Sequence, residues 1–193
     1  MIYIVANGGW KGNAFATSGG MSELRKATTE QPYFLTFTVT QWVDVFTRSS
    51  YCDILIDSLR FCQTHKKLEV YAYVIMTNHI HLIAAHPEGR SSGVIRDFKS
   101  FTAKQIIQEH PGESRRTWLL HMFAYAAKFQ QQNPRYLFWQ KTSHPTELYN
   151  ATIFHQKKDY IHQNPVTAGY VAEAHHWYYS SAHPRSPLSV ISA

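Results

Sequence analysis

The sequence predicts an α+β fold, a ferredoxin-like sandwich with a β-α-β-β-α-β core, an antiparallel sheet and an added C-terminal helix. Strand-like and helix-like patterns follow one another along the chain in this order. The second and third strand-like runs are separated only by Thr77-Asn78, a spacing typical of a tight hairpin. With 193 residues, 44% of them hydrophobic, the chain is long enough for one globular domain with a substantial core.

The first half of the chain supplies the strand-helix-strand-strand part of the pattern. Residues 32–43 (PYFLTFTVTQWV) alternate and are rich in β-branched and aromatic residues, which predicts a strand. Residues 50–67 place apolar side chains at helical spacing and predict a helix. Two further strands are expected at 68–77 and 79–86.

The second half begins with helices. An apolar stripe with basic residues outside it predicts an amphipathic helix at 92–110, which Pro111-Gly112 would end. Residues 116–130 predict another helix, and RYLFWQ (135–140) is expected to be a strand.

The last helix is expected from about Ala151 to Asn164. Asn150 is a suitable N-cap, and Pro165 is expected to stop the helix because proline cannot donate a backbone hydrogen bond. Beyond Gly169 the chain is expected to pack through its aromatic side chains and then to fray.

The domain boundaries follow from composition. Residues 1–20 carry five of the nine glycines and no strand or helix period, so we expect a tag, a misread start or a loosely attached arm. Residues 21–182 are expected to form a single domain, followed by a C-terminal tail at 183–193.

The charge is basic and uneven. The formal net charge is +6, and the span from Arg90 to Lys158 holds eleven Lys and Arg against four Asp and Glu. Such a basic half on a nearly neutral scaffold indicates a polyanionic partner, with nucleic acid the first candidate. A basic protein without such a partner is the alternative. The sequence contains no run of 18 apolar residues, so no membrane span is expected.

The two cysteines indicate a reducing environment. Cys52 and Cys62 are ten residues apart on one expected helix, a separation of about 15 Å that prevents them from pairing with each other. We therefore expect a cytoplasmic protein with free thiols.

A pair of histidines interrupts the third strand, in TNHIHLI (77–83). Because successive side chains of a strand point to opposite faces, His79 and His81 share one face while Ile80 and Leu82 share the other. Two neighbouring imidazoles can bind one divalent cation. The chain has twelve histidines, so this motif alone is a weak signal.

A second set of polar residues lies on the last expected helix, in KKDYIHQNPV. Tyr160 and Asn164 are four residues apart and share one helix face, with Lys157 and Lys158 nearby. Asn164 offers a carbonyl oxygen as a third metal ligand, and a phenolate beside a metal is a competent nucleophile toward a phosphodiester. The alternative is a half-buried aromatic residue and a helix C-cap.

Several phrases in fixed order resemble a known family. They are NHIHLI (78–83), FKSFTAKQI (98–106), FWQ (138–140) with HPTEL (144–148), DYIHQNPVTAGYV (159–171) and WYYSSA (177–182). From about Tyr33 to Ala182 the chain resembles the single-tyrosine HUH transposases of the insertion-sequence-200-like group, most closely the REP-associated tyrosine transposases.

The resemblance implies a transposase, a DNA strand transferase that cuts and rejoins single-stranded DNA at hairpin ends and usually acts as a homodimer. It implies that Tyr160 is the nucleophile, forming a 5′-phosphotyrosine link, and that His79, His81 and Asn164 hold Mg²⁺ or Mn²⁺. Whether the histidines meet Tyr160 of the same chain or of a second one stays open. Nothing resembles a Gly-rich phosphate loop, so no nucleotide cofactor is expected.

Two other functions stay open beside this one: a catalytically silent hairpin-DNA-binding domain, and a metal-dependent phosphodiester hydrolase that uses the histidine pair. DNA contact is expected from a group of basic residues rather than from any one of them, namely Arg96, Lys99, Lys104, Arg115, Arg116, Lys157 and Lys158.

Overall fold

The computed structural model describes residues 27, 29–108, 113–130, 134–141 and 145–192. The expected N-terminal arm, residues 1–20, lies outside them. Within the described part of the chain, no helix combines the length and apolar character needed to cross a membrane.

Four antiparallel strands form one sheet: β1 (Tyr33–Thr38), β2 (Glu69–Ile75), β3 (His79–Ala85) and β4 (Thr146–Glu147). Their order across the sheet is β2-β3-β1-β4. Between β2 and β3 the chain turns tightly, and the backbone N–H of Met76 donates to the carbonyl of His79 at 2.8 Å. The predicted hairpin and the ferredoxin-like sandwich are confirmed.

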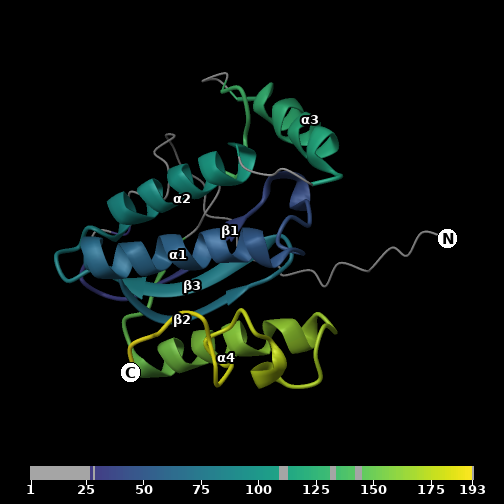
Figure 1. Cartoon of the computed structure of the whole chain (residues 1–193). Coiled ribbons are helices and arrows are strands. Elements are labelled where there is room, and N and C mark those ends of the chain that lie inside the picture. Colours follow the sequence, from purple (N-terminus) through teal and green to yellow (C-terminus); the bar gives the residue numbers. More distant parts are fainter. Residues whose placement is uncertain (1–26, 28, 109–112, 131–133, 142–144, 193) are drawn as a thin grey trace, which may run out of the picture.

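Helices cover both faces of the sheet (Figure 1). On one face lie α1 (Ser49–Lys66) and α2 (Ser91–Gln108), which pack against each other, and α4 (Ala151–Thr167) lies on the other. The helix α3 (Arg116–Ala127) follows α2, and the described residues also include the short 3₁₀ helices η2 (Thr40–Trp42) and η3 (Ala174–His176). Cys52 and Cys62 on α1 are buried free thiols, as predicted.

Strand alternation separates two cores. On β1, Leu35 and Phe37 point into the larger core beneath α1 and α2, whereas Phe34 points into a smaller core beneath α4. Phe154 and Ile161 are the buried residues of α4 in this smaller core. They anchor α4 on the sheet, and the exposed side of the helix is left for other contacts.

The first strand is shorter than predicted. It ends at Thr38, because the backbone at Gln41 and Trp42 takes positive φ values of 56° and 55°, which no strand can include. The residues expected as a strand at 135–140 contribute only a single bridge, between Trp139 and Val39. The fourth strand of the sheet is instead β4, which pairs with β1.

The last helix continues through Pro165, against the prediction. Its N-cap is as expected, since the Asn150 side chain accepts a hydrogen bond from the Ile153 N–H at 2.8 Å. The helix ends instead at Thr167, with Ala168 as its C-cap. Just beyond it, Gly169 has a φ of +76°, which lets its N–H bond to the carbonyl of Val166 and the N–H of Tyr170 bond to that of Pro165. Proline removes one helical hydrogen bond, but its φ is compatible with a helix.

The C-terminal segment does not fray but lies along the outer edge of β2. Backbone bonds join Tyr179 to Ile75, Ser181 to Tyr73 and Ile191 to Val70, at 2.8–3.0 Å. Leu188 is buried in the larger core. This segment covers a strand edge that would otherwise be open to pairing with another chain.

Candidate active site

The two histidines lie side by side on the face of β3 that α4 covers. Their ring centroids are 4.7 Å apart, and across the sheet His79 faces Thr38 while His81 faces Thr36. Ile80 and Leu82 point into the larger core on the opposite side. The predicted common face of the histidine pair is confirmed.

His81 is held in one orientation by its neighbours. Its Nδ1 is hydrogen-bonded to the hydroxyl of Thr36 at 2.8 Å, and its ring stacks on Phe34 with centroids 5.4 Å apart. Only 5% of its surface is exposed. Burial, aided by the nearby His79 and Lys157, lowers the pKa of His81 to about 3, so the ring is neutral near pH 7 and one of its nitrogens carries a lone pair.

His79 is oriented by a chain of hydrogen bonds. Its Nδ1 donates to the side-chain oxygen of Asn78 at 2.7 Å, and the Asn78 amide donates to the carboxylate of Asp44 at 2.9 Å. Because that oxygen can only accept, the proton of His79 lies on Nδ1 and Nε2 carries a lone pair. Burial lowers the pKa of His79, while a hydrogen bond with Asn164 and the charge of Asp44 oppose the shift.

Tyr160 lies on α4 next to the histidine pair of its own chain. Its ring centroid is 5.2 Å from that of His81 and 5.8 Å from that of Phe34, both edge-on. The side chain is 49% exposed, so a substrate can reach the phenol. One turn earlier, the ammonium of Lys157 lies 5.7 Å from the Tyr160 ring centroid and 4.7 Å from that of Phe34.

Asn164 lies one turn after Tyr160, and its side chain is close enough to His79 to oppose the lowering of the pKa of that ring. The alternative interpretation of Asn164 as a C-cap is wrong, because the helix continues to Thr167 and its C-cap is Ala168. Four residues expected at the site are therefore neighbours in one chain. Two imidazole nitrogens and one amide oxygen are a donor set that fits a divalent cation such as Mg²⁺ or Mn²⁺.

The seven basic residues expected to contact DNA do not form one group. Lys157 alone among them contacts the site, while Lys158 is on the same helix. Arg115 is bound to Glu113 at 3.1 Å. Lys99 is largely buried, donates to the carbonyl of Gln140 at 3.1 Å and has its pKa lowered to about 8 by that burial.

The remaining three lie away from α4: Arg96 and Lys104 are exposed on α2, and Arg116 begins α3. Their DNA contact stays a prediction.

Sequence reasoning missed the residues that support the histidines: Thr36, Asn78 and Asp44. Asn78 was visible as the neighbour of His79 in the NHIH phrase. Thr36 could be found only through the pairing of β1 with β3, which places it opposite His81. Asp44 is 34 residues from Asn78 in sequence, and no local pattern connects the two.

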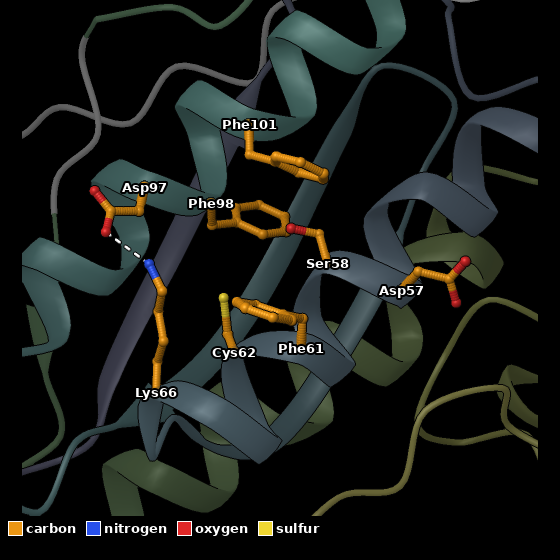
Figure 2. Close-up of a pocket in the computed structure, with 8 residues that line it drawn as sticks. All are labelled: Asp57, Ser58, Phe61, Cys62, Lys66, Asp97, Phe98 and Phe101. Carbon is orange, nitrogen blue, oxygen red and sulfur yellow. Dashed lines mark hydrogen bonds and ion pairs between the residues drawn. The ribbon is translucent and has the colours of Figure 1, made fainter.

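A hollow of about 430 Å³ lies elsewhere, between α1 and α2. Figure 2 shows Phe98 and Phe101 from α2 facing Phe61 from α1, with Lys66 and Asp97 paired at its side at 2.7 Å. It is on the face of the sheet opposite α4, and none of the predicted site residues lines it.

Known proteins resemble this chain in sequence and in fold. A family model described as "Transposase IS200 like" matches residues 28–133, a span that contains both histidines and ends before Tyr160. Among solved structures, a REP-associated tyrosine transposase bound to a REP hairpin is 19% identical, with a TM-score of 0.50 over 80% of this chain and 78% of that chain. No curated protein matches. Because the family model covers more than half of the sequence, the chain belongs to the IS200-like transposase family.

Proposed function

We propose that this chain nicks and rejoins single-stranded DNA at hairpin ends, with Tyr160 as the nucleophile. The observation that carries the proposal is the placement of the Tyr160 ring 5.2 Å from His81 within one chain. A REP hairpin is bound by the transposase of similar fold, which suggests the same class of substrate here. A site complete in one chain does not need a second copy, and the expected homodimer stays a proposal.

The reaction exchanges one phosphoester for another. The phenol oxygen of Tyr160 forms a bond to phosphorus, the bond from phosphorus to the 3′ oxygen breaks, and the phenol loses its proton while the 3′ oxygen gains one. The products are a 5′-phosphotyrosine link and a free 3′-OH. Because the new ester has an energy similar to the old one, a 3′-OH can reverse the step and join strands without ATP.

His79, His81 and Asn164 would hold the divalent cation. When bound, such an ion neutralises charge that develops on the phosphate under attack. The hydrogen bonds that the two rings make with Thr36 and Asn78 fix their orientation, which reduces the rearrangement needed for binding.

Among the described residues, Lys157 is the cation best placed to hold the scissile phosphate. Its ammonium lies over the rings of Phe34 and Tyr160. Its ammonium would attract the phosphate to the nucleophile and favour the ionised phenol in the transition state.

The other two functions make different products. A hydrolase that activates water with the histidine pair would leave no protein–DNA adduct, and a silent binding domain would leave the DNA whole. The close contact between Tyr160 and the histidine pair favours the nucleophile, since neither alternative requires it.

The test uses a labelled hairpin oligonucleotide, Mn²⁺ and denaturing electrophoresis, which retains a covalent adduct. Wild-type protein should form the adduct, and Tyr160→Phe should form none. Tyr178→Phe is the matched control, since Tyr178 has nearly the same exposure, 48%. An adduct with Tyr160→Phe would overturn the assignment, and cleavage without an adduct would establish the hydrolase.

A further inference from the structure

The turn after β1 holds an exposed tryptophan on a strained backbone. Gln41 and Trp42 both have positive φ, at 56° and 55°, a conformation that is unfavourable for a residue with a side chain. The indole of Trp42 is 59% exposed. Strained backbone is concentrated at ligand-binding and active sites, so an exposed aromatic ring on such a turn is a candidate for contact with a ligand.

Specific hydrogen bonds hold this turn in place. The backbone N–H of Trp42 donates to Val39 at 3.0 Å, and that of Thr40 donates to Phe138 at 2.7 Å. The carbonyl of Trp42 accepts from the side chain of Asn78 at 3.3 Å. Asn78 also orients His79, so the turn and the metal-ligand candidate share one support.

Trp42 lies at the border between the candidate active site and a second hollow. Its ring is edge-on to His79 with centroids 6.1 Å apart. It also lines an open hollow of about 450 Å³, a size typical of small-molecule sites. A group bound in this hollow would therefore be a neighbour of whatever is bound at the histidines.

The lining of this hollow has the chemistry of a nucleotide site. Trp42 and the exposed Phe129 supply aromatic faces, on which bases of any sequence can stack. Gln130 supplies an amide that suits a base edge, and Lys141 supplies an ammonium for a phosphate. The amide of Gln140 instead donates to the carbonyl of Val39 at 3.3 Å and helps to hold the wall of the hollow. Of the described residues that line it, none is acidic, which matches a polyanionic occupant.

We propose that this hollow takes the base of a nucleotide that flanks the cleaved phosphate, stacked on Trp42. The inference rests on the proposed function, since it takes the phosphate at the histidine pair as the point from which the strand continues. Stacking there fixes the register of the strand and so selects which phosphate meets Tyr160. Trp42 is thus a positioning residue for the DNA.

The test measures equilibrium binding of fluorescent single-stranded oligonucleotides with hairpin ends, without divalent cation, so that no cleavage is needed. Trp42→Ala should weaken binding on the order of tenfold, and Trp42→Phe should keep most of the affinity. Trp118→Ala on α3 is the matched control, with a similar exposure of 51%, and should bind as wild type does.

An abasic nucleotide moved stepwise along the oligonucleotide identifies the stacked base. At one position beside the cleavage point, wild type and Trp42→Ala should bind equally well, because the base that Trp42 holds is missing. Should Trp42→Ala prove too unstable for the assay, Trp42→Leu keeps the apolar bulk without an aromatic face and is compared in the same way.

Two results would overturn the inference: unchanged binding in Trp42→Ala or Trp42→Leu, or a loss of equal size for every abasic oligonucleotide. Either result would leave the Tyr160 adduct, and with it the proposed function, intact. If wild-type protein binds no single-stranded DNA at all, both proposals fail together.

Discussion

His79 donates its Nδ1 proton to Asn78 at 2.7 Å, and this one contact determines which nitrogen of His79 faces the active site. Removing the acceptor would let the ring rotate and change tautomer. We expect Asn78→Ala to weaken Mn²⁺ binding on the order of 10- to 100-fold while the fold is retained. Titration with Mn²⁺, followed by electron paramagnetic resonance, measures this affinity.

The control for Asn78→Ala is Gln163→Ala, which removes an exposed amide from α4 between Tyr160 and Asn164. Its Mn²⁺ affinity should equal that of wild type. Equal affinity in Asn78→Ala as well would show that the hydrogen bond does not orient a metal ligand.

The placement of Tyr160 beside the histidines of its own chain predicts the result of a mixing experiment. His81→Ala lacks one metal-ligand candidate, and Tyr160→Phe lacks the nucleophile. If the site is complete within one chain, an equimolar mixture of the two variants should form no adduct with a hairpin oligonucleotide. Recovery of up to half the wild-type level in the mixture would show that two chains share each site.

The contacts of Glu113 make part of the free energy of unfolding sensitive to acid. Its buried carboxylate bonds to Arg115 and Arg48, each at 3.1 Å, and to the hydroxyl of Tyr51 at 3.3 Å. The hydrogen bond from Arg115, ahead of the other contacts, lowers the pKa of Glu113 to about 2. The unfolded chain binds this proton at higher pH than the folded one, so the stabilisation is complete above about pH 4.5 and is lost as the pH falls toward 2.

Glu113→Gln tests this dependence. At pH 7 the variant should be less stable by on the order of 3 kcal/mol, because two arginines lose a buried partner. Urea unfolding at several pH values should show the difference shrinking as the pH falls from 5 to 2. Glu173→Gln is the control, since Glu173 is exposed and pairs only with His175 among the described residues. A difference that does not change with pH would contradict the assignment.

Local sequence patterns were enough to predict the placement of most residues of the candidate site. Alternation alone placed His79 and His81 on one face, and helical spacing alone placed Asn164 one turn from Tyr160. Local patterns could not separate the basic residues that are free to contact DNA from those that bind other parts of the protein. A sequence shows that Lys99 is charged but does not show that Gln140, 41 positions later, comes back to bind it.

The errors in the fold have the same origin. RYLFWQ has the composition of a strand, but a strand needs a ladder of paired residues, and this segment forms a single bridge, between Trp139 and Val39. A proline usually ends a helix, yet here the helix runs past Pro165. The N–H groups of Gly169 and Tyr170 make the hydrogen bonds that close its end. Both outcomes depend on contacts that no window of a few residues contains.

The segment along β2 also constrains the order in which the protein can be made. Tyr73, on the outer strand β2, is hydrogen-bonded to Ser181, which is 108 positions further along the chain. The outer edge of the sheet is therefore covered only after Ser181 has been synthesised. While the chain is still on the ribosome, the hairpin of β2 and β3 can pair with β1, but one row of backbone groups stays exposed. During that interval two nascent chains could join edge to edge, so slow translation of the region after α4 would favour aggregation.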